Sequence, residues 1–132
     1  VVKRDPAQLD ARAELGFLYF RGGDVDRAMR VLGELLEDEP RHPLGLLYLG
    51  RALYRKGRTA QAEESFKAAA KLDPHFAEPH NALGQLYEAQ KKWAEAKAAY
   101  QKAVELAPNH PDAAASVKRM EKQLGTATAP VP

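Results

Sequence analysis

Cysteine is absent from the sequence, and this absence excludes two kinds of small domain. The chain can form no disulfide framework, and it can hold no zinc through thiolate ligands. Long apolar runs are also missing, because each run is only a few residues long and a bilayer-spanning helix needs about 20. We therefore expect no direct membrane insertion and a core that depends on packing alone.

Net charge is nearly absent as well. The 132 residues carry 20 Lys and Arg against 18 Asp and Glu, which gives a formal charge of +2. Such a charge provides no field that would attract nucleic acid or anionic lipid. Apolar residues make up 45% of the sequence, as in folded globular chains. The composition predicts one compact unit without a nucleic-acid partner.

What the sequence does contain is an internal repeat of 34 residues. Proline recurs at this spacing at Pro6, Pro40, Pro74 and Pro108. Three further columns share the spacing: Gly16, Gly50 and Gly84; Ala28, Ala62 and Ala96; and Leu32, Phe66 and Tyr100. No insertion interrupts these columns, so each repeat is expected to form the same local structure.

Apolar residues within each repeat fall at helical spacing, which predicts two amphipathic helices per repeat. Glycine in the short turn between them tolerates the left-handed conformation that ends a helix. The third turn, residues 90–92, lacks glycine and should be slightly less favourable. The recurring proline should stop each second helix, and the glycine and alanine columns should let the two helices approach closely.

This pattern resembles the tetratricopeptide repeat. The third repeat matches most fully, with Leu83, Gly84, Tyr87, Ala96, Tyr100 and Pro108. The first repeat departs most, since Arg12 and Asp38 stand where large apolar residues are usual. The resemblance covers residues 1–124 and implies an all-α fold, a right-handed superhelical solenoid of antiparallel helix pairs with about seven helices.

The repeat spacing also predicts the organisation of the chain. Residues 1–6 are expected to end the second helix of a preceding repeat, or else to be an ordinary N-terminal segment. The expected segments after them are three full repeats at 7–40, 41–74 and 75–108, a capping helix at 109–125 that ends at Gly125, and a disordered tail or linker at 126–132.

Residues that would support catalysis are not found in a recognisable arrangement. Ser65 and Ser116 have no motif around them, and no glycine-rich phosphate loop occurs. His42, His75 and His110 fall at successive inter-repeat corners, which should not converge on a metal ion. We therefore expect no enzyme activity, no cofactor and no metal.

The resemblance implies that the first helices line a concave groove that binds a partner. The matching residues are Phe17, Phe20, Arg21, Leu44, Leu47, Tyr48, Arg51, Tyr54, Arg55, Asn81 and Gln85. Phe17 and Tyr48 are the strongest candidates, whereas Phe20 and Tyr54 could instead pack between helices. The family's clamp for acidic chaperone tails is not matched, because its positions hold Ala13, Phe17, Tyr48, Glu78 and Ala82.

Together these features predict a non-catalytic protein–protein interaction module that serves as a scaffold for a multiprotein complex. Its partner is expected to be a peptide or helix, amphipathic and with acidic residues, because arginine lies beside the aromatic side chains. Self-association as a homo-oligomer and a regulatory role within a larger enzyme remain alternatives. Composition is compatible with a bacterial source and leaves the compartment open between cytoplasm and periplasm.

Overall fold

The computed structural model describes residues 5–128, which contain seven helices and no strand. The predicted all-α fold is therefore confirmed. The chain divides into two compact units, residues 1–74 and 75–132. The expectation of one compact unit is wrong because each helix packs mainly against its neighbours in the sequence, so the repeats need not share one central core.

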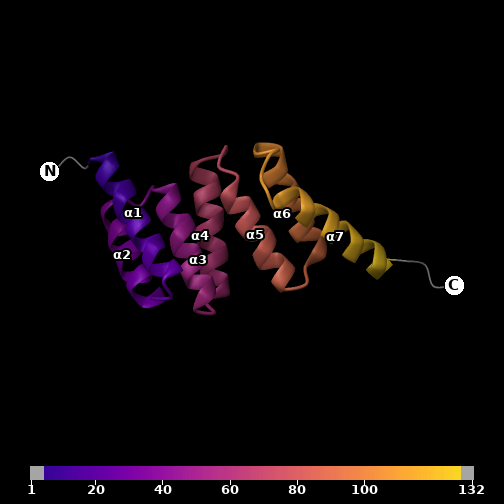
Figure 1. Ribbon diagram of the computed structural model, residues 1–132, viewed down its shortest axis with the longest axis horizontal. Coiled ribbons are helices and arrows are strands. Elements are labelled where there is room, and N and C mark those ends of the chain that lie inside the picture. Colours follow the sequence, from indigo (N-terminus) through magenta and orange to yellow (C-terminus); the bar gives the residue numbers. More distant parts are fainter. Residues whose placement is uncertain (1–4, 129–132) are drawn as a thin grey trace. The chain divides into compact units, whose positions relative to one another are not determined.

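The first unit consists of two helical hairpins (Figure 1). Its helices are α1 (Pro6–Arg21), α2 (Val25–Asp38), α3 (Pro43–Arg55) and α4 (Thr59–Leu72). The helix α2 packs against both α1 and α3, and α1 also contacts α3. The first helices of the two hairpins, α1 and α3, therefore lie near each other. Side chains from both helices can contribute to one surface.

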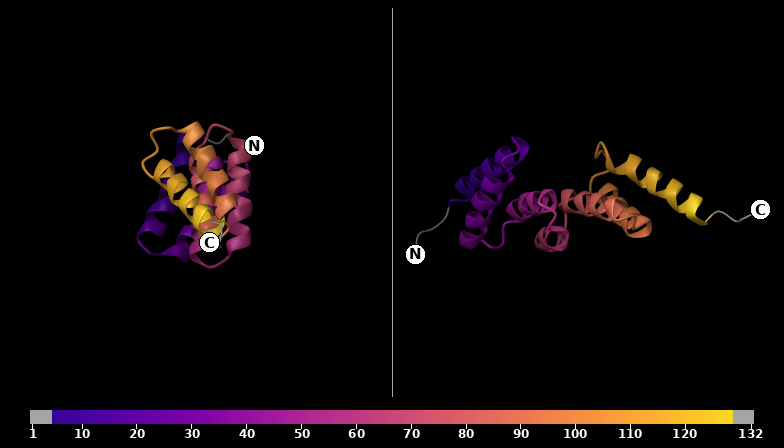
Figure 2. Two further views of the ribbon diagram at one scale, coloured as in Figure 1. Left: turned by 90° about the vertical axis from the view of Figure 1, so that its right-hand side faces the viewer. Right: turned by 90° about the horizontal axis from the view of Figure 1, so that it is seen from below.

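The second unit consists of one hairpin and a further helix (Figure 2). Its helices are α5 (Glu78–Ala89), α6 (Trp93–Leu106) and α7 (Ala113–Thr128). The helix α6 packs against both α5 and α7. Tyr100 and Met120 are fully buried in a core cluster with Ala96, and Trp93 packs against that cluster.

Close approach within each hairpin depends on the glycine column. A Cβ atom placed on Gly50 would lie 2.5 Å from Cε1 of Phe66, and one on Gly84 would lie 2.6 Å from the Tyr100 ring. Both distances are too short for real atoms, so only glycine admits the large side chain of the partner helix. The predicted close approach is confirmed, and its physical cause is a buried ring seated directly on the glycine.

The turns inside the hairpins use the left-handed conformation in all three repeats. Gly23 and Gly57 have φ values of 89° and 82°, and Lys91 takes the same role with a φ of 60°. The recurring proline follows the end of each second helix, as predicted, because α2, α4 and α6 end two residues before it. The third turn thus places a lysine in a conformation that favours glycine.

Replacing Lys91 with glycine is expected to stabilise the second unit by about 1 kcal/mol, because glycine adopts a positive φ without steric cost. The urea dependence of Trp93 fluorescence measures this change, since Trp93 is the single tryptophan of the chain. Gly57→Lys, which lies in the first unit, should lower the unfolding free energy of that unit when circular dichroism follows urea unfolding. An unfolding free energy that falls in Lys91→Gly would contradict the assigned strain.

Two histidines cap helices rather than lying free in loops. His42 accepts a hydrogen bond from the backbone N–H of Gly45 at Nδ1, over 2.9 Å, and its Nε2 lies 2.9 Å from Asp10. His110 similarly accepts from the N–H of Ala113, and its Nε2 lies 2.6 Å from Glu78. Because Nδ1 accepts, the proton resides on Nε2, which donates to the carboxylate.

The predicted ends of the chain need two corrections. Pro6 is the first residue of α1 rather than the end of an earlier helix, because Asp5 caps α1 by accepting from the N–H of Ala7. The last helix does not end at Gly125 but continues to Thr128, because a single glycine lowers helix stability without ending the helix. Residues 1–4 and 129–132, where the preceding repeat and the tail were expected, lie outside the described residues.

Candidate functional site

The first unit brings together a set of aromatic and arginine side chains from α1 and α3. The rings of Phe17 and Tyr48 are stacked, with centroids 4.5 Å apart and an angle of 19° between their planes. The ring of Phe20 lies 6.2 Å from that of Phe17. All three rings are half-buried, so each retains an accessible part. The repeat spacing places Phe17 and Tyr48 on successive first helices, which explains their contact.

Two exposed arginines stand over these rings. The guanidinium carbon of Arg55 lies 4.5 Å from the centroid of Phe20, and that of Arg21 lies 5.9 Å from the centroid of Phe17. The N–H groups of a guanidinium point outward in the plane of that group. A guanidinium that stacks on a ring can therefore still donate hydrogen bonds to a carboxylate. We call Phe17, Phe20, Tyr48, Arg21 and Arg55 the arginine-aromatic surface.

Packing against the core of the first unit holds the Tyr48 side chain in position. It packs against the buried cluster of Leu9, Ala13 and Leu35, and its hydroxyl donates to Oε1 of Glu14 over 3.2 Å. One side of the ring therefore belongs to the core and the other side faces Phe17. This support holds the arginine-aromatic surface in place before any partner binds.

The other predicted groove residues of the first unit are placed differently. Leu47 is only 2% exposed and belongs to the core, so its prediction as a residue that lines an open groove is wrong. Leu44 is half-buried against the same cluster as Tyr48. Tyr54 is exposed rather than packed between helices, and Arg51 is half-buried.

The two predicted residues of the second unit also differ from each other. Asn81 is buried, so the expectation that it lines an open groove is wrong. Gln85 is exposed and lies at the edge of a pocket of about 580 Å³ between α5 and α7. The residues that line the pocket are Gln85, Glu88, Ala89, Lys91, Trp93, Tyr100, Asp112, Ala115, Ser116, Arg119 and Gln123.

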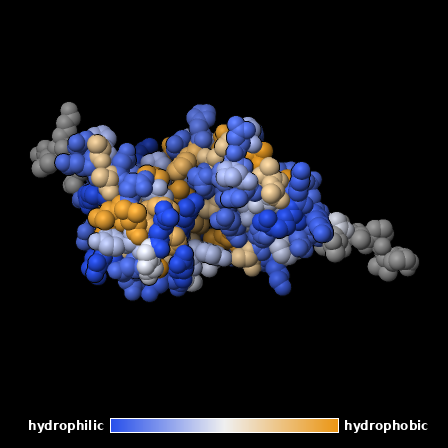
Figure 3. All heavy atoms as spheres, in the orientation of Figure 1, coloured by the Kyte–Doolittle hydropathy of each residue, from blue (hydrophilic) through white to orange (hydrophobic). Residues whose placement is uncertain are grey.

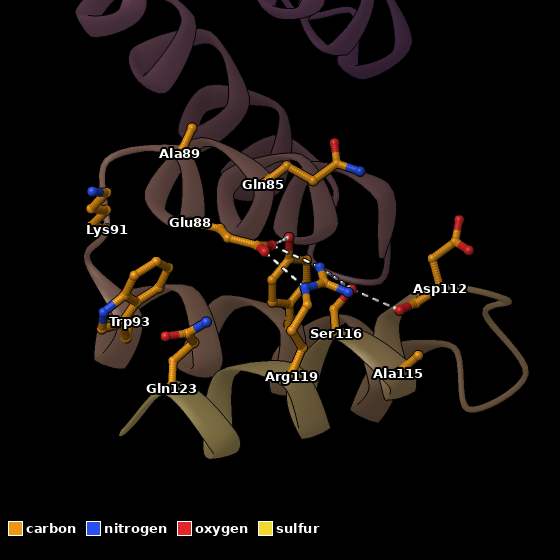
Figure 4. Close-up of a pocket in the computed structure, with 11 residues that line it drawn as sticks. Gln85, Glu88, Ala89, Lys91, Trp93, Asp112, Ala115, Ser116, Arg119 and Gln123 are labelled. Atoms are coloured by element: carbon orange, nitrogen blue, oxygen red, sulfur yellow. Dashed lines mark hydrogen bonds and ion pairs between the residues drawn. The ribbon is translucent and has the colours of Figure 1, made fainter. Parts of the chain in front are cut away.

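An ion pair crosses this pocket (Figure 4). Arg119 of α7 donates from Nε and Nη2 to the two carboxylate oxygens of Glu88 on α5, each over 2.8 Å. The hydroxyl of Tyr100 donates to the same carboxylate over 2.7 Å. Sequence reasoning did not find this network, because nothing in the repeat pattern indicates that Arg119 reaches back to α5.

The network shifts the acidity of its members. The hydrogen bonds from Arg119 hold the pKa of Glu88 below its usual range, and Glu88 in turn raises the pKa of Arg119. Burial, followed by the hydrogen bond to Glu88, raises the pKa of the Tyr100 hydroxyl. Glu88 is therefore ionised near neutral pH, and the ion pair is present there.

Lowering the pH is expected to destabilise the second unit through protonation of Glu88. Because the folded-state pKa of Glu88 is lowered, its contribution to the free energy of unfolding is present above the ordinary pKa of 4.5. That contribution is lost as the pH falls below this value. We expect Arg119→Gln to lose less stability than the unaltered chain between about pH 7 and about pH 3 in urea unfolding followed by Trp93 fluorescence. Equal losses in the two chains would contradict the assigned role.

No group of three or more histidine, cysteine, aspartate or glutamate side chains within residues 5–128 is arranged to hold a metal ion. Among the same residues, no helix combines the length and apolar character needed to cross a membrane. The candidate sites are thus the arginine-aromatic surface of the first unit and the polar pocket of the second.

Solved structures with a similar fold are numerous. The first TPR of Spaghetti (RPAP3), bound to the HSP90 peptide SRMEEVD, aligns with a TM-score of 0.83 at 24% identity and covers 95% of this chain and 99% of that chain. The Yersinia enterocolitica type III secretion chaperone SycD, in complex with a peptide of the translocator YopD, aligns with a TM-score of 0.79 at 18% identity, with coverage of 91% and 97%. These likenesses establish the TPR-like solenoid class of the fold.

Relatives by sequence carry the same repeat. The human tetratricopeptide repeat protein 13 is 35% identical over 72 residues, which are 54% of this chain and 8% of that protein. Across the curated relatives that it matches, the chain spans only 8% to 30% of their length. The family model for the tetratricopeptide repeat matches residues 14–75 and 49–114. The chain belongs to the tetratricopeptide repeat family.

Proposed function

We propose that this chain is a protein-interaction module that binds a peptide or helix on the arginine-aromatic surface of its first unit. The observation that carries the proposal is the stacked pair of Phe17 and Tyr48, with Arg21 over Phe17 and Arg55 over the neighbouring ring of Phe20. Aromatic and arginine side chains are the residues that most often dominate binding energy at protein interfaces. The aromatic rings supply a large contact area at a small entropic cost, because they have few rotatable bonds.

The chemistry of the surface favours an amphipathic partner with acidic residues. The half-buried rings of Phe17, Phe20 and Tyr48 would cover apolar side chains. Arg21 and Arg55, exposed and held against two of those rings, would donate charge-assisted hydrogen bonds to carboxylates. A purely polar peptide would leave the rings uncovered, and a basic one would be repelled by the two guanidinium groups.

Peptide-bound structures of similar fold support this proposal. The RPAP3 domain was solved with the HSP90 peptide SRMEEVD, which carries three acidic residues, and SycD with a peptide of the translocator YopD. Here the positions of the family's clamp hold Ala13, Phe17 and Tyr48 in the first unit, so binding would rest on stacking and arginine rather than on lysine and asparagine. The module would act without a catalytic step and hold partners as a scaffold.

Replacing Phe17 or Tyr48 with alanine is expected to weaken peptide binding by about 2 kcal/mol, or about 30-fold. The probes are peptides selected from a random phage-displayed library on the immobilised chain, and titration calorimetry measures their affinity. Phe17 is half-buried, so circular dichroism should show little loss of helicity.

Tyr19→Ala is the matched control for this experiment. Tyr19 also carries an arginine over its ring, with the Arg27 guanidinium carbon 5.2 Å from the centroid, but it does not belong to the arginine-aromatic surface. Its replacement should leave the affinity of the selected peptides within about twofold. Affinities that stay unchanged in Phe17→Ala and Tyr48→Ala would refute the assignment of the site.

A further inference from the structure

A residue under backbone strain borders the polar pocket of the second unit. Lys91 has a φ of 60°, whereas the matching turns of the first unit have glycine at this position, Gly23 and Gly57. A lysine in the left-handed conformation carries a steric cost that glycine would avoid. Residues held in such conformations cluster at ligand clamps and active sites. Because Lys91 also lines the pocket between α5 and α7, its side chain is a candidate for binding a ligand there.

The chemistry of the pocket changes from one end to the other (Figure 4). Lys91 and Trp93 lie at one end, where an exposed ammonium group stands near a half-buried indole ring. No carboxylate within residues 5–128 forms an ion pair with Lys91. Trp93 packs against the buried cluster of Ala96, Tyr100 and Met120, which holds its ring in position. This end of the pocket therefore offers a positive charge beside a fixed apolar surface.

The middle of the pocket contains an arginine that can donate further hydrogen bonds. Arg119 holds Glu88 through Nε and Nη2, and Nη2 also lies 3.2 Å from Oγ of Ser116. The Nη1 amino group forms none of these bonds and can donate two more. The Arg119 side chain is 49% exposed, so a ligand can reach it. Because Glu88 would repel a second carboxylate at this point, an uncharged acceptor such as a main-chain carbonyl suits Nη1 better.

The surroundings of the pocket favour a largely polar ligand. Hydrophilic residues predominate on the face of the second unit that Figure 3 shows. Among the residues that line the pocket, the apolar side chains are two alanines and the two rings of Trp93 and Tyr100. A purely apolar partner would leave the other lining groups without hydrogen bonds, at a cost in binding energy. An extended peptide, which brings its own main-chain groups, fits this lining better.

The pocket also differs from the family's clamp for acidic chaperone tails. In the second unit the clamp positions hold Glu78 and Ala82, and neither residue lines the pocket. Lys91, Trp93 and Arg119 do not stand at clamp positions. A ligand of this pocket would therefore be recognised by a different set of side chains.

We propose that the pocket between α5 and α7 is a second binding site, which takes a short peptide segment of a partner with an acidic residue next to an apolar one. The acidic side chain would pair with Lys91, and the apolar side chain would cover Trp93. A main-chain carbonyl would accept from Nη1 of Arg119. Gln85 and Gln123, both exposed and at the same pocket, would bond to further main-chain groups.

Peptides selected from a random phage-displayed library without tryptophan are the probe for this site. The selection uses the immobilised double variant Phe17→Ala, Arg55→Ala, in which the arginine-aromatic surface is no longer intact. Binding of the synthesised peptides to the unaltered chain is then followed through Trp93, the single tryptophan. We expect its emission to move to shorter wavelengths as an apolar side chain covers the ring. The selected sequences should share an acidic residue next to an apolar one.

Lys91→Gly separates binding from stability. We expect this variant to bind the peptides at least fivefold more weakly, because the ammonium group is lost. The chain itself should become more stable, since glycine relieves the strain at this turn. A merely structural lysine would not produce this opposite pair of changes. Lys92→Gln is the matched control, because Lys92 is exposed but does not line the pocket, and its affinity should stay within about twofold.

Three results would overturn the proposal. The first is a selection that yields no peptide able to change the Trp93 emission at up to about 1 mM. The second is an affinity that Lys91→Gly leaves unchanged, and the third is a set of selected peptides without acidic residues. Because the selection uses a chain whose first surface is disrupted, failure here leaves the proposed function standing, and the reverse also holds.

Discussion

Replacing Tyr100 with alanine is expected to lower the unfolding free energy of the second unit by about 3–5 kcal/mol. Its ring is fully buried, rests on Gly84 and packs with Ala96 and Met120, so its removal leaves a cavity between all three helices of the unit. Trp93 packs against the same cluster. Urea unfolding followed by its fluorescence therefore reports on this region directly.

Tyr100→Phe separates the ring from its hydroxyl. This variant keeps the packing of the ring and loses the hydrogen bond to Glu88, whose two carboxylate oxygens Arg119 still holds. We expect it to cost about 1 kcal/mol. A loss below about 1 kcal/mol in Tyr100→Ala would show that the ring on the glycine column is not what joins these helices.

Gly50→Ala is expected to destabilise the first unit by about 1–3 kcal/mol, although alanine normally favours a helix. The added methyl group would fall 2.5 Å from the ring of Phe66, which is itself buried and has little room to move. Circular dichroism during urea unfolding measures the change. The sign of the effect follows from the neighbouring ring and not from helix propensity.

Gly33→Ala provides the opposite result in the same unit. Gly33 lies inside α2, and a Cβ atom there would have nothing within 4 Å. Alanine should therefore stabilise the helix by about 0.5–1 kcal/mol. If both substitutions changed stability in the same direction, the glycine column could not be the reason for the close approach of the helices.

The repeat period made most of the fold predictable from the sequence. Columns that recur without insertion fix the positions of the helices, the turns and the proline stops, and Lys91 could be identified as the less favourable turn because glycine is missing there. Local spacing is sufficient for such features because each hairpin forms from contacts between sequence neighbours. The burial of Leu47 and Asn81 was missed, because it depends on how a helix is rotated and not on its period.

Polar contacts between side chains of different helices were also missed. Arg12 and Asp38 each departed from the repeat pattern, and the structure joins them in an ion pair of 2.8 Å. Two departures in one repeat, of opposite charge, were the signal that could have predicted it. His42 and His110 are 68 residues apart, which is two repeats, and their carboxylate partners Asp10 and Glu78 are separated by the same distance in the sequence. This recurring pair of a histidine and an acidic residue could have predicted the same contact in both repeats.

The central claim is that a partner binds the arginine-aromatic surface of the first unit. Its most direct test is an NMR titration of the ¹⁵N-labelled chain with a peptide selected on the unaltered protein. We expect the amide signals that shift most to belong to α1 and α3, with those of Phe17 and Tyr48 among them. Shifts confined to α5, α6 and α7, with α1 and α3 unaffected, would contradict it.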